Sequence, residues 1–248
     1  MIDALLMLLA ASQTAICPVG DRDLRPGPRD VCIGRENNDY SFAVLYPAAA
    51  DPIPALRQIL RRDAAASERR TIAAAAEFRR ERGSDSGERI PMSHEQQWTA
   101  DADRPELLAL SSAATFYLGG AHGGFRYHSI LWDRRGGRQI RFLQLFGDQR
   151  SAARLLTRQF CPALRAAQRE RLGNEYSEVS LLPCPDIANQ PITMRTDSSG
   201  RIQGFTVLLA PYVAGSWAEG PYEVELPLTG ALRRLILPRY APAFAAGS

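Results

Sequence analysis

The stretch GGAHGGFRYHSILWDRRGG, residues 119–137, is the part of the sequence that says most about the fold. Side chains at 125–132 alternate between two sets with the period of two that is typical of a β-strand. A glycine cluster at 119–124 precedes this strand, and residues 133–137 after it favour a turn. The stretch therefore predicts a strand that begins and ends at tight turns, with antiparallel neighbours.

Helices and further strands are predicted on both sides of this stretch. Apolar residues recur with helical spacing from Asp51, a residue that suits a helix cap, to Gly83. A second helix is predicted from a cap at Asp148 to Gly173. Strand patterns occupy residues 41–46, 192–196, 202–209 and 222–228. We therefore predict an α+β fold, in which an antiparallel sheet has two main helices packed on one face.

The composition is that of a globular protein, and it excludes several kinds of site. Of 248 residues, 45% are hydrophobic and 23% are charged, and all 30 basic residues are arginine. A chain without lysine has no Schiff-base or pyridoxal site, no Walker-type phosphate loop and no Ser-Lys dyad. The net charge is +3, but acids interrupt the arginines at 57–82 with helical spacing, which predicts a solvated helix face. We therefore expect no nucleic-acid partner.

The first residues are similar to an export signal. The apolar run at 4–11 has the length of a signal-peptide core and is too short to cross a bilayer. We predict an atypical signal peptide at 1–15, because Asp3 stands where a basic residue is usual and the best cleavage site comes early. A start codon further upstream would explain both departures, and a buried N-terminal helix is the alternative. No apolar run of eighteen residues is present, so we expect a periplasmic or secreted protein without a transmembrane anchor.

Four cysteines are present, and none of them forms a Cys-x-x-Cys pair. An even number without that spacing favours two disulfides over a zinc site or a redox motif. The preferred pairs are nearest neighbours, Cys17 with Cys32 and Cys161 with Cys184. The other two pairings stay open, as does the alternative of four reduced cysteines in a cytosolic protein.

No group of residues nominates a catalytic site. The chain has three histidines, and the spacing of His122 and His128 differs from the one-turn spacing of two metal ligands on a helix. A Gly-x-Ser-x-Gly nucleophile elbow is absent from the sequence. We therefore predict no catalytic residue, no metal and no cofactor. The glycine cluster is either a tight turn with a structural His122 or a backbone surface that a partner approaches closely.

Two groups of motifs resemble those of the PdaC/RsiV-like extracytoplasmic domains. The first group is Tyr117-Leu118-Gly119-Gly120-Ala121-His122, followed by an Asp-x-x-x-Gly-Arg run from Asp133 and by Leu-Gln-Leu-Phe at 143–146. The second group is Pro211-Tyr212, Ala-Glu-Gly-Pro-Tyr at 218–222 and Leu226-Pro227. The resemblance implies one domain whose N-terminal part is 33–135 and whose C-terminal part is 136–240, with a tail at 241–248.

The resemblance also implies a function in the cell envelope. Family members sense lysozyme in anti-sigma factors or precede peptidoglycan deacetylase domains, but the sigma-binding and deacetylase parts are not expected here. We predict a non-catalytic protein that binds a wall glycan or a protein such as a lysozyme. One alternative is an envelope hydrolase with a site around His122 and Asp133, and another is a purely structural envelope protein. The sequence leaves the oligomeric state open. The candidate binding residues are Tyr117, Gly119, Gly120, His122, Tyr212, Trp217 and Tyr222.

Overall fold

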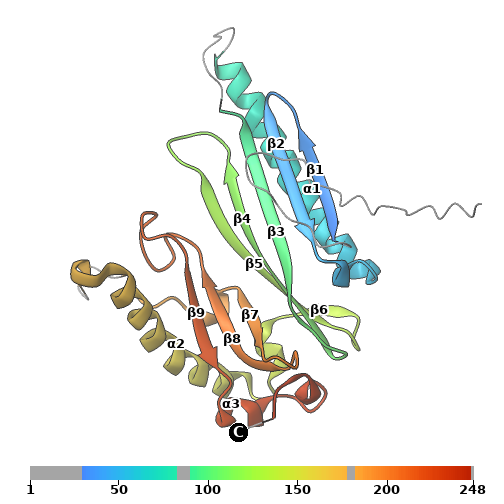
Figure 1. Cartoon of the computed structure of the whole chain (residues 1–248), viewed down its shortest axis with the longest axis vertical. Helices are drawn as coiled ribbons and strands as arrows, with labels where there is room; N and C mark the ends of the chain where they lie inside the picture. Colours follow the sequence, from blue (N-terminus) through green and yellow to red (C-terminus); the bar gives the residue numbers. More distant parts are fainter. Residues whose placement is uncertain (1–29, 83–89, 178–181, 247–248) are drawn as a thin grey trace, which may run out of the picture.

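The computed structural model of the chain describes residues 30–82, 90–177 and 182–246. The signal peptide expected at 1–15, Cys17 and the last two residues of the tail lie outside these ranges. Within them, the chain forms two β-sheets and two long helices (Figure 1). No helix in the described ranges is long and apolar enough to cross a membrane.

The first sheet has six strands, and their order in the sheet follows their order in the chain. Neighbouring strands are antiparallel except β2 and β3, which are parallel. A parallel pair needs a long crossover, and the helix α1 (Pro54–Arg82) lies in this connection. The six strands are β1 (Val31–Glu36), β2 (Tyr40–Tyr46), β3 (Met92–Asp103), β4 (Leu107–Tyr117), β5 (Gly124–Asp133) and β6 (Arg138–Ile140).

The second sheet is an antiparallel meander of β7 (Ile192–Thr196), β8 (Ile202–Leu209) and β9 (Tyr222–Pro227). The helix α2 (Gln149–Leu172) precedes it, and the Asp148 carboxylate caps this helix by accepting a hydrogen bond from the Ser151 amide. A short helix, α3 (Gly230–Leu235), follows the sheet. Single 3-10 turns are η1 (Ala48–Ala50), η2 (Phe142–Leu145), η3 (Gly173–Glu175), η5 (Ile187–Asn189) and η6 (Ala241–Ala243).

Two hydrophobic cores hold these elements in layers. In one core, Leu56 and Leu60 of α1 pack on the face of the first sheet that carries Trp98 and Leu110. The other core joins the opposite face of that sheet to the second sheet and to α2. The layers therefore run in the order α1, first sheet, second sheet, α2, and Figure 1 shows α1 beside β1 to β3 and α2 beside β9.

This architecture confirms the α+β class, the mostly antiparallel strands and the two main helices. The strands are divided between two sheets, however, and each main helix packs on its own sheet. The reason is that local patterns locate strands but do not select their partners. The chain passes through α2 between β6 and β7, and it starts a separate sheet there.

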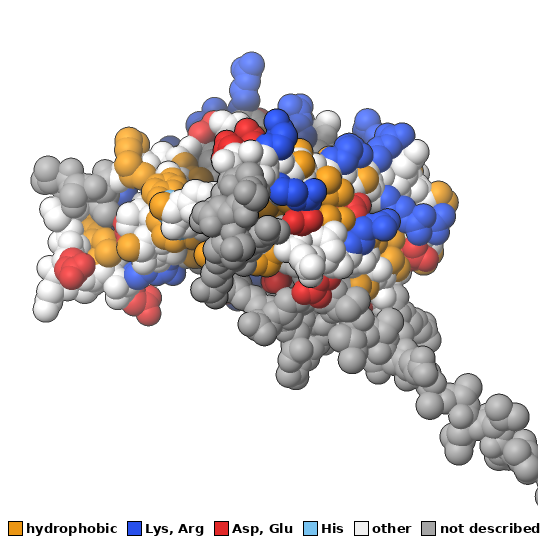
Figure 2. Space-filling model, turned by 90° about the horizontal axis from the view of Figure 1, so that it is seen from above, with side chains coloured by type: hydrophobic (Ala, Val, Ile, Leu, Met, Phe, Trp, Pro, Cys, Tyr) orange, Lys and Arg blue, Asp and Glu red, His pale blue; other side chains and the backbone are white. Residues whose placement is uncertain are grey.

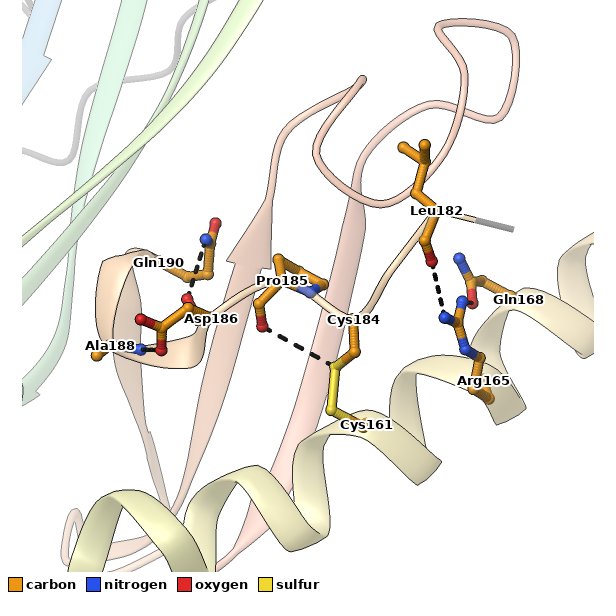
Figure 3. Close-up of a disulfide and its surroundings, with 9 residues drawn as sticks. All are labelled: Cys161, Arg165, Gln168, Leu182, Cys184, Pro185, Asp186, Ala188 and Gln190. Carbon is orange, nitrogen blue, oxygen red and sulfur yellow. Dashed lines mark hydrogen bonds between the residues drawn. A yellow bond between two sulfur atoms is a disulfide. The ribbon is translucent and has the colours of Figure 1, made fainter. Parts of the chain in front are cut away.

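One predicted disulfide is present. Cys161 of α2 is bonded to Cys184, and this bond ties the segment before β7 to the helix (Figure 3). Close by, the Arg165 guanidinium donates a hydrogen bond to the Leu182 carbonyl at 2.7 Å. Cys32 is disulfide-bonded as well, whereas its predicted partner, Cys17, lies outside the described residues.

Arginine side chains on the surface lie among acidic ones. Arg35 is paired with Glu68 at 2.6 Å, and the guanidinium of Arg79 is paired with Asp39. Figure 2 shows acidic side chains between the arginines on the face seen from above. Exposed pairs of this kind contribute about 0–1 kcal/mol each, so they shape the surface charge more than the stability.

Candidate functional site

The two loops nominated from the sequence meet in space. One connects β4 to β5 and carries His122, and the other connects β8 to β9 and carries Tyr212 and Trp217. The rings of His122 and Trp217 are stacked with centroids 4.7 Å apart. The Tyr212 ring lies 6.4 Å from His122 and 6.1 Å from Trp217. These three residues, which we call the aromatic tip, join the ends of two different sheets.

The β4–β5 loop needs its glycines for its shape. Gly119 and Gly120 both have φ of 95°, a left-handed conformation that disfavours other residues. At Gly124, a Cβ atom would lie 2.1 Å from the ring of Phe116, so only a glycine fits there without a shift of that ring. Tyr117 closes the turn by donating a hydrogen bond to the Gly120 carbonyl at 3.1 Å. The glycine cluster is thus a tight turn, and it also places His122 at the surface.

Hydrogen bonds orient the His122 ring. Its Nδ1 atom lies 2.7 Å from the Gly123 carbonyl, which can only accept. Its Nε2 atom lies 3.4 Å from the Tyr212 hydroxyl, which can donate. The contact with the carbonyl places a proton on Nδ1. Such a ring offers a flat face for stacking.

Tyr212 is held in an unfavourable conformation. Its φ is 70°, and it is the one non-glycine residue with positive φ in the described ranges. Its side chain is 60% exposed. A non-glycine residue in this region costs about 1–3 kcal/mol, and such strain clusters at functional sites. The surrounding loop keeps this large aromatic side chain exposed in spite of that cost.

Glu219 organises the inside of the β8–β9 loop. Its carboxylate accepts hydrogen bonds from the Ser216 amide and the Tyr222 hydroxyl, both at 2.7 Å. Burial alone would raise the pKa of Glu219, but these bonds outweigh it and the pKa lies below its ordinary value. Burial and the bond to Glu219 raise the pKa of Tyr222 to about 12. The loop is therefore held by a carboxylate–phenol pair over a wide pH range.

The helix α2 supports the same loop from outside. Arg171 donates hydrogen bonds to the carbonyls of Glu219 and Pro221 at 2.8 and 2.7 Å. One turn earlier, the buried amide of Gln168 donates to the Ala214 carbonyl at 2.7 Å. The loop that carries Tyr212 and Trp217 is thus attached to a helix, and that helix is itself tied by the Cys161–Cys184 disulfide.

The candidate residues differ in what they present to a ligand. His122 and Tyr212 are exposed, and Tyr117 and Trp217 are half-buried. Tyr222 is only 1% exposed, so it supports the loop from the core. Gly119 and Gly120 shape the turn beside His122.

The structure separates the pair proposed for a hydrolase. His122 precedes β5 and Asp133 ends it, so a whole strand lies between them. Asp133 is 2% exposed, and its carboxylate accepts hydrogen bonds from the Gly136 amide and the Tyr240 hydroxyl. Asp133 therefore has a structural role, and the alternative of a hydrolase with this pair loses its site. Within the described ranges, no group of three or more His, Cys, Asp or Glu side chains could hold a metal.

Two further residues near the tip were not indicated by the sequence. The Tyr127 hydroxyl of β5 donates a hydrogen bond to the Glu223 carboxylate of β9 at 2.7 Å, and it links the two sheets just below the tip. In the sequence, only their positions, three residues after Gly124 and one after Tyr222, could have indicated that these two residues lie near the tip. A separate hollow of about 610 Å³ lies beside β6 and the start of α2, away from the tip.

Comparison with known proteins identifies solved structures that share this fold. No protein-family model matches the sequence, and no curated protein matches it. The structure is similar to that of a DUF3298 family protein from Pseudomonas aeruginosa PAO1, with a TM-score of 0.56 and 14% identity over 88% of this chain and 96% of that one. It is also similar to a member of the same family from Bacteroides fragilis NCTC 9343, with a TM-score of 0.55 and 14% identity over 85% and 93% of the two chains. At this identity the similarity shows a shared fold.

Proposed function

We propose that the protein is a non-catalytic, PdaC/RsiV-like protein of the periplasm or the secreted fraction, and that its aromatic tip binds a ligand of the cell envelope. The observation that supports this most is the convergence of His122, Tyr212 and Trp217 from two sheets, with Tyr212 held exposed in a strained conformation. Exposed aromatic side chains on a rigid support are typical anchors of binding surfaces.

The disulfide supports a location outside the cytoplasm. Disulfides such as Cys161–Cys184 persist in oxidising compartments and are rare where thiols are kept reduced. The fold similarity to DUF3298 family proteins agrees with the resemblance to extracytoplasmic domains. Both point to a ligand that is found in the envelope.

A wall glycan fits this surface better than a lysozyme does. Many lysozymes are strongly basic, and a chain with a net charge of +3 does not steer towards them. The stacked rings of the tip need no charge on the ligand, because flat aromatic faces bind the apolar faces of sugar rings through contact area. We therefore place a glycan first among the envelope ligands.

Co-sedimentation with purified insoluble cell wall tests the proposal, and immobilised lysozyme serves as the second ligand. The wild-type protein is expected to bind, and Tyr212→Ala with Trp217→Ala is expected to reduce binding at least tenfold. Ile72→Ala is a matched control, because Ile72 is 42% exposed on α1, on the other side of the first sheet. Wild-type protein that binds neither ligand would leave the purely structural alternative in its place.

A further inference from the structure

A cleft of about 450 Å³ lies between the two sheets, on the side of the aromatic tip. We call it the inter-sheet cleft, and the side chains that matter in it are Gln97, Asp101, Tyr127, Thr206 and Glu223. Its volume falls in the range of roughly 300–1,000 Å³ that small-ligand sites occupy.

The cleft begins close to the aromatic tip. Tyr127 lies three residues after the start of β5, and Glu223 is the residue after Tyr222 at the end of the β8–β9 loop. Their hydrogen bond of 2.7 Å marks the end of the cleft nearest the tip. From Gln97 to Asp101 the cleft wall then runs four residues along β3, or roughly 13 Å at about 3.3 Å per residue. The cleft therefore begins at strand positions next to the two loops of the tip and extends away from them along β3.

The lining of the cleft is rich in polar side chains where two packed sheets usually share an apolar core. Asp101 is half-buried, and its carboxylate accepts hydrogen bonds from the hydroxyls of Thr99 and Thr193. Burial raises the pKa of Asp101 above its ordinary value. A buried polar group costs stability unless it is hydrogen-bonded, and the two threonine hydroxyls meet this need for Asp101.

One hydroxyl in the lining makes no hydrogen bond. Thr206 of β8 is 8% exposed and lines the cleft, and its hydroxyl makes no hydrogen bond with any residue in the described ranges. The amide of Gln97, which is exposed at the mouth of the cleft, is also without a hydrogen bond among the described residues. Both groups are available to a ligand that both donates and accepts hydrogen bonds.

The charges in the lining define the chemistry of the ligand. Asp101 and Glu223 are the charged groups among the described residues of the lining, and both are acidic. Carboxylates accept hydrogen bonds from sugar hydroxyls and repel anionic groups. We propose that the inter-sheet cleft binds the following units of a neutral oligosaccharide whose first units stack on the aromatic tip. This inference rests on the proposed function and specifies its ligand.

Chain-length dependence separates the cleft from the tip. The probes are chito-oligosaccharides, which are neutral β-1,4-linked N-acetylglucosamine chains, and affinities are measured by isothermal titration calorimetry. The hexamer is expected to bind at least tenfold more tightly than the dimer, because only the hexamer reaches from the tip into the cleft. Hexagalacturonate, which carries a carboxylate on each unit, is expected to lose this advantage.

The variant Thr206→Val removes the unpaired hydroxyl and keeps the side-chain shape. It is expected to weaken hexamer binding about three- to tenfold, the worth of one hydrogen bond, and to leave dimer binding unchanged. Thr196→Val is the matched control in the same sheet, because Thr196 does not line the cleft. If Thr206→Val does not fold, Gln97→Ala at the mouth of the cleft gives the same test.

Each result has a separate consequence. If Thr206→Val and Gln97→Ala bind the hexamer as tightly as the wild type does, the cleft is not a binding site. The proposal that the tip binds a ligand is not affected by that result. Equal affinity of the wild type for dimer and hexamer would lead to the same conclusion. Binding of wild-type protein to whole cell wall but to neither chito-oligosaccharide would overturn the neutral glycan and leave the proposed function. Weaker binding of both dimer and hexamer by Tyr212→Ala, together with weaker binding of the hexamer alone by Thr206→Val, would support both the tip and the cleft.

Discussion

The burial of His94 predicts a loss of stability in mild acid. Its ring is 6% exposed and stacks between Phe42 at 5.5 Å and Phe116 at 6.3 Å. Its Nε2 atom has no hydrogen-bond partner among the described residues. Burial lowers the pKa of His94 from 6.5 to about 4, and the nearby guanidiniums of Arg70 and Arg126 act in the same direction.

The direction of the stability change follows from the pKa values of His94 in the unfolded and folded states. The unfolded chain takes up a proton at His94 near pH 6.5, whereas the folded protein resists it until about pH 4. The folded state is therefore fully favoured at pH 7 and loses stability as the pH falls through this window. At about 1.4 kcal/mol per tenfold difference in proton affinity, the loss is about 2 kcal/mol between pH 7 and pH 5 and about 3 kcal/mol at pH 4.

Urea unfolding at pH 7, 6 and 5 measures this loss. The variant His94→Phe keeps an aromatic ring in the stack and removes the titrating group. Most of the loss of about 2 kcal/mol between pH 7 and pH 5 should therefore be absent from this variant. A smaller slope should remain, because burial also lowers the pKa of His128. Phe116→Leu is the control, since it loosens the same stack without removing a titrating group.

Equal losses of unfolding free energy in wild type and His94→Phe between pH 7 and pH 5 would refute the role of His94. A wild-type protein whose stability does not change over this range would refute it equally. Phe116→Leu should be less stable than wild type at each pH and keep the wild-type slope. Carboxylates titrate mainly below this range, so the difference between the two curves reports His94.

Three other substitutions test separate parts of the structure. Gly124→Ala places a Cβ atom against the ring of Phe116, and we expect a loss of about 1–3 kcal/mol in urea unfolding together with weaker wall binding. Replacing Cys161 and Cys184 by serine opens a loop with a sequence separation of 23, and the expected loss is about 3 kcal/mol, measured against the oxidised wild type. Tyr212→Gly relieves the positive φ while it removes the exposed ring, so its stability should stay within about 1 kcal/mol of wild type and its wall binding should fall. A Tyr212→Gly protein with unchanged binding would count against the aromatic tip.

Local signals in the sequence were sufficient for most individual elements. The Asp148 cap and Gly173 bracket α2 as predicted, because a helix end needs a side-chain acceptor at one terminus and a left-handed residue near the other. The alternation at 125–132 became β5, and nearest-neighbour spacing identified the Cys161–Cys184 pair. These features depend on residues that are close in the chain.

The candidate site was predictable only in part. Both loops and three tip residues were nominated from a family resemblance, but their meeting was not, since His122 and Tyr212 are 90 residues apart in the chain. Tyr222 was expected at the surface and lies in the core, where its hydroxyl holds Glu219. Tyr127 and Glu223 look like ordinary outward-facing strand residues until the two sheets bring them together.

Local patterns in the sequence were enough to predict the class of the fold, the bounds of the main helices and most strands, and the absence of lysine chemistry. Turn residues, caps and periodicity act over a few residues, so a single sequence contains them in full. The folded structure was needed to show that β2 and β3 are parallel, that the strands form two sheets, and that a cleft rich in polar side chains lies between them. Pairings between distant segments depend on which apolar faces cover one another, and that choice belongs to the folded chain as a whole.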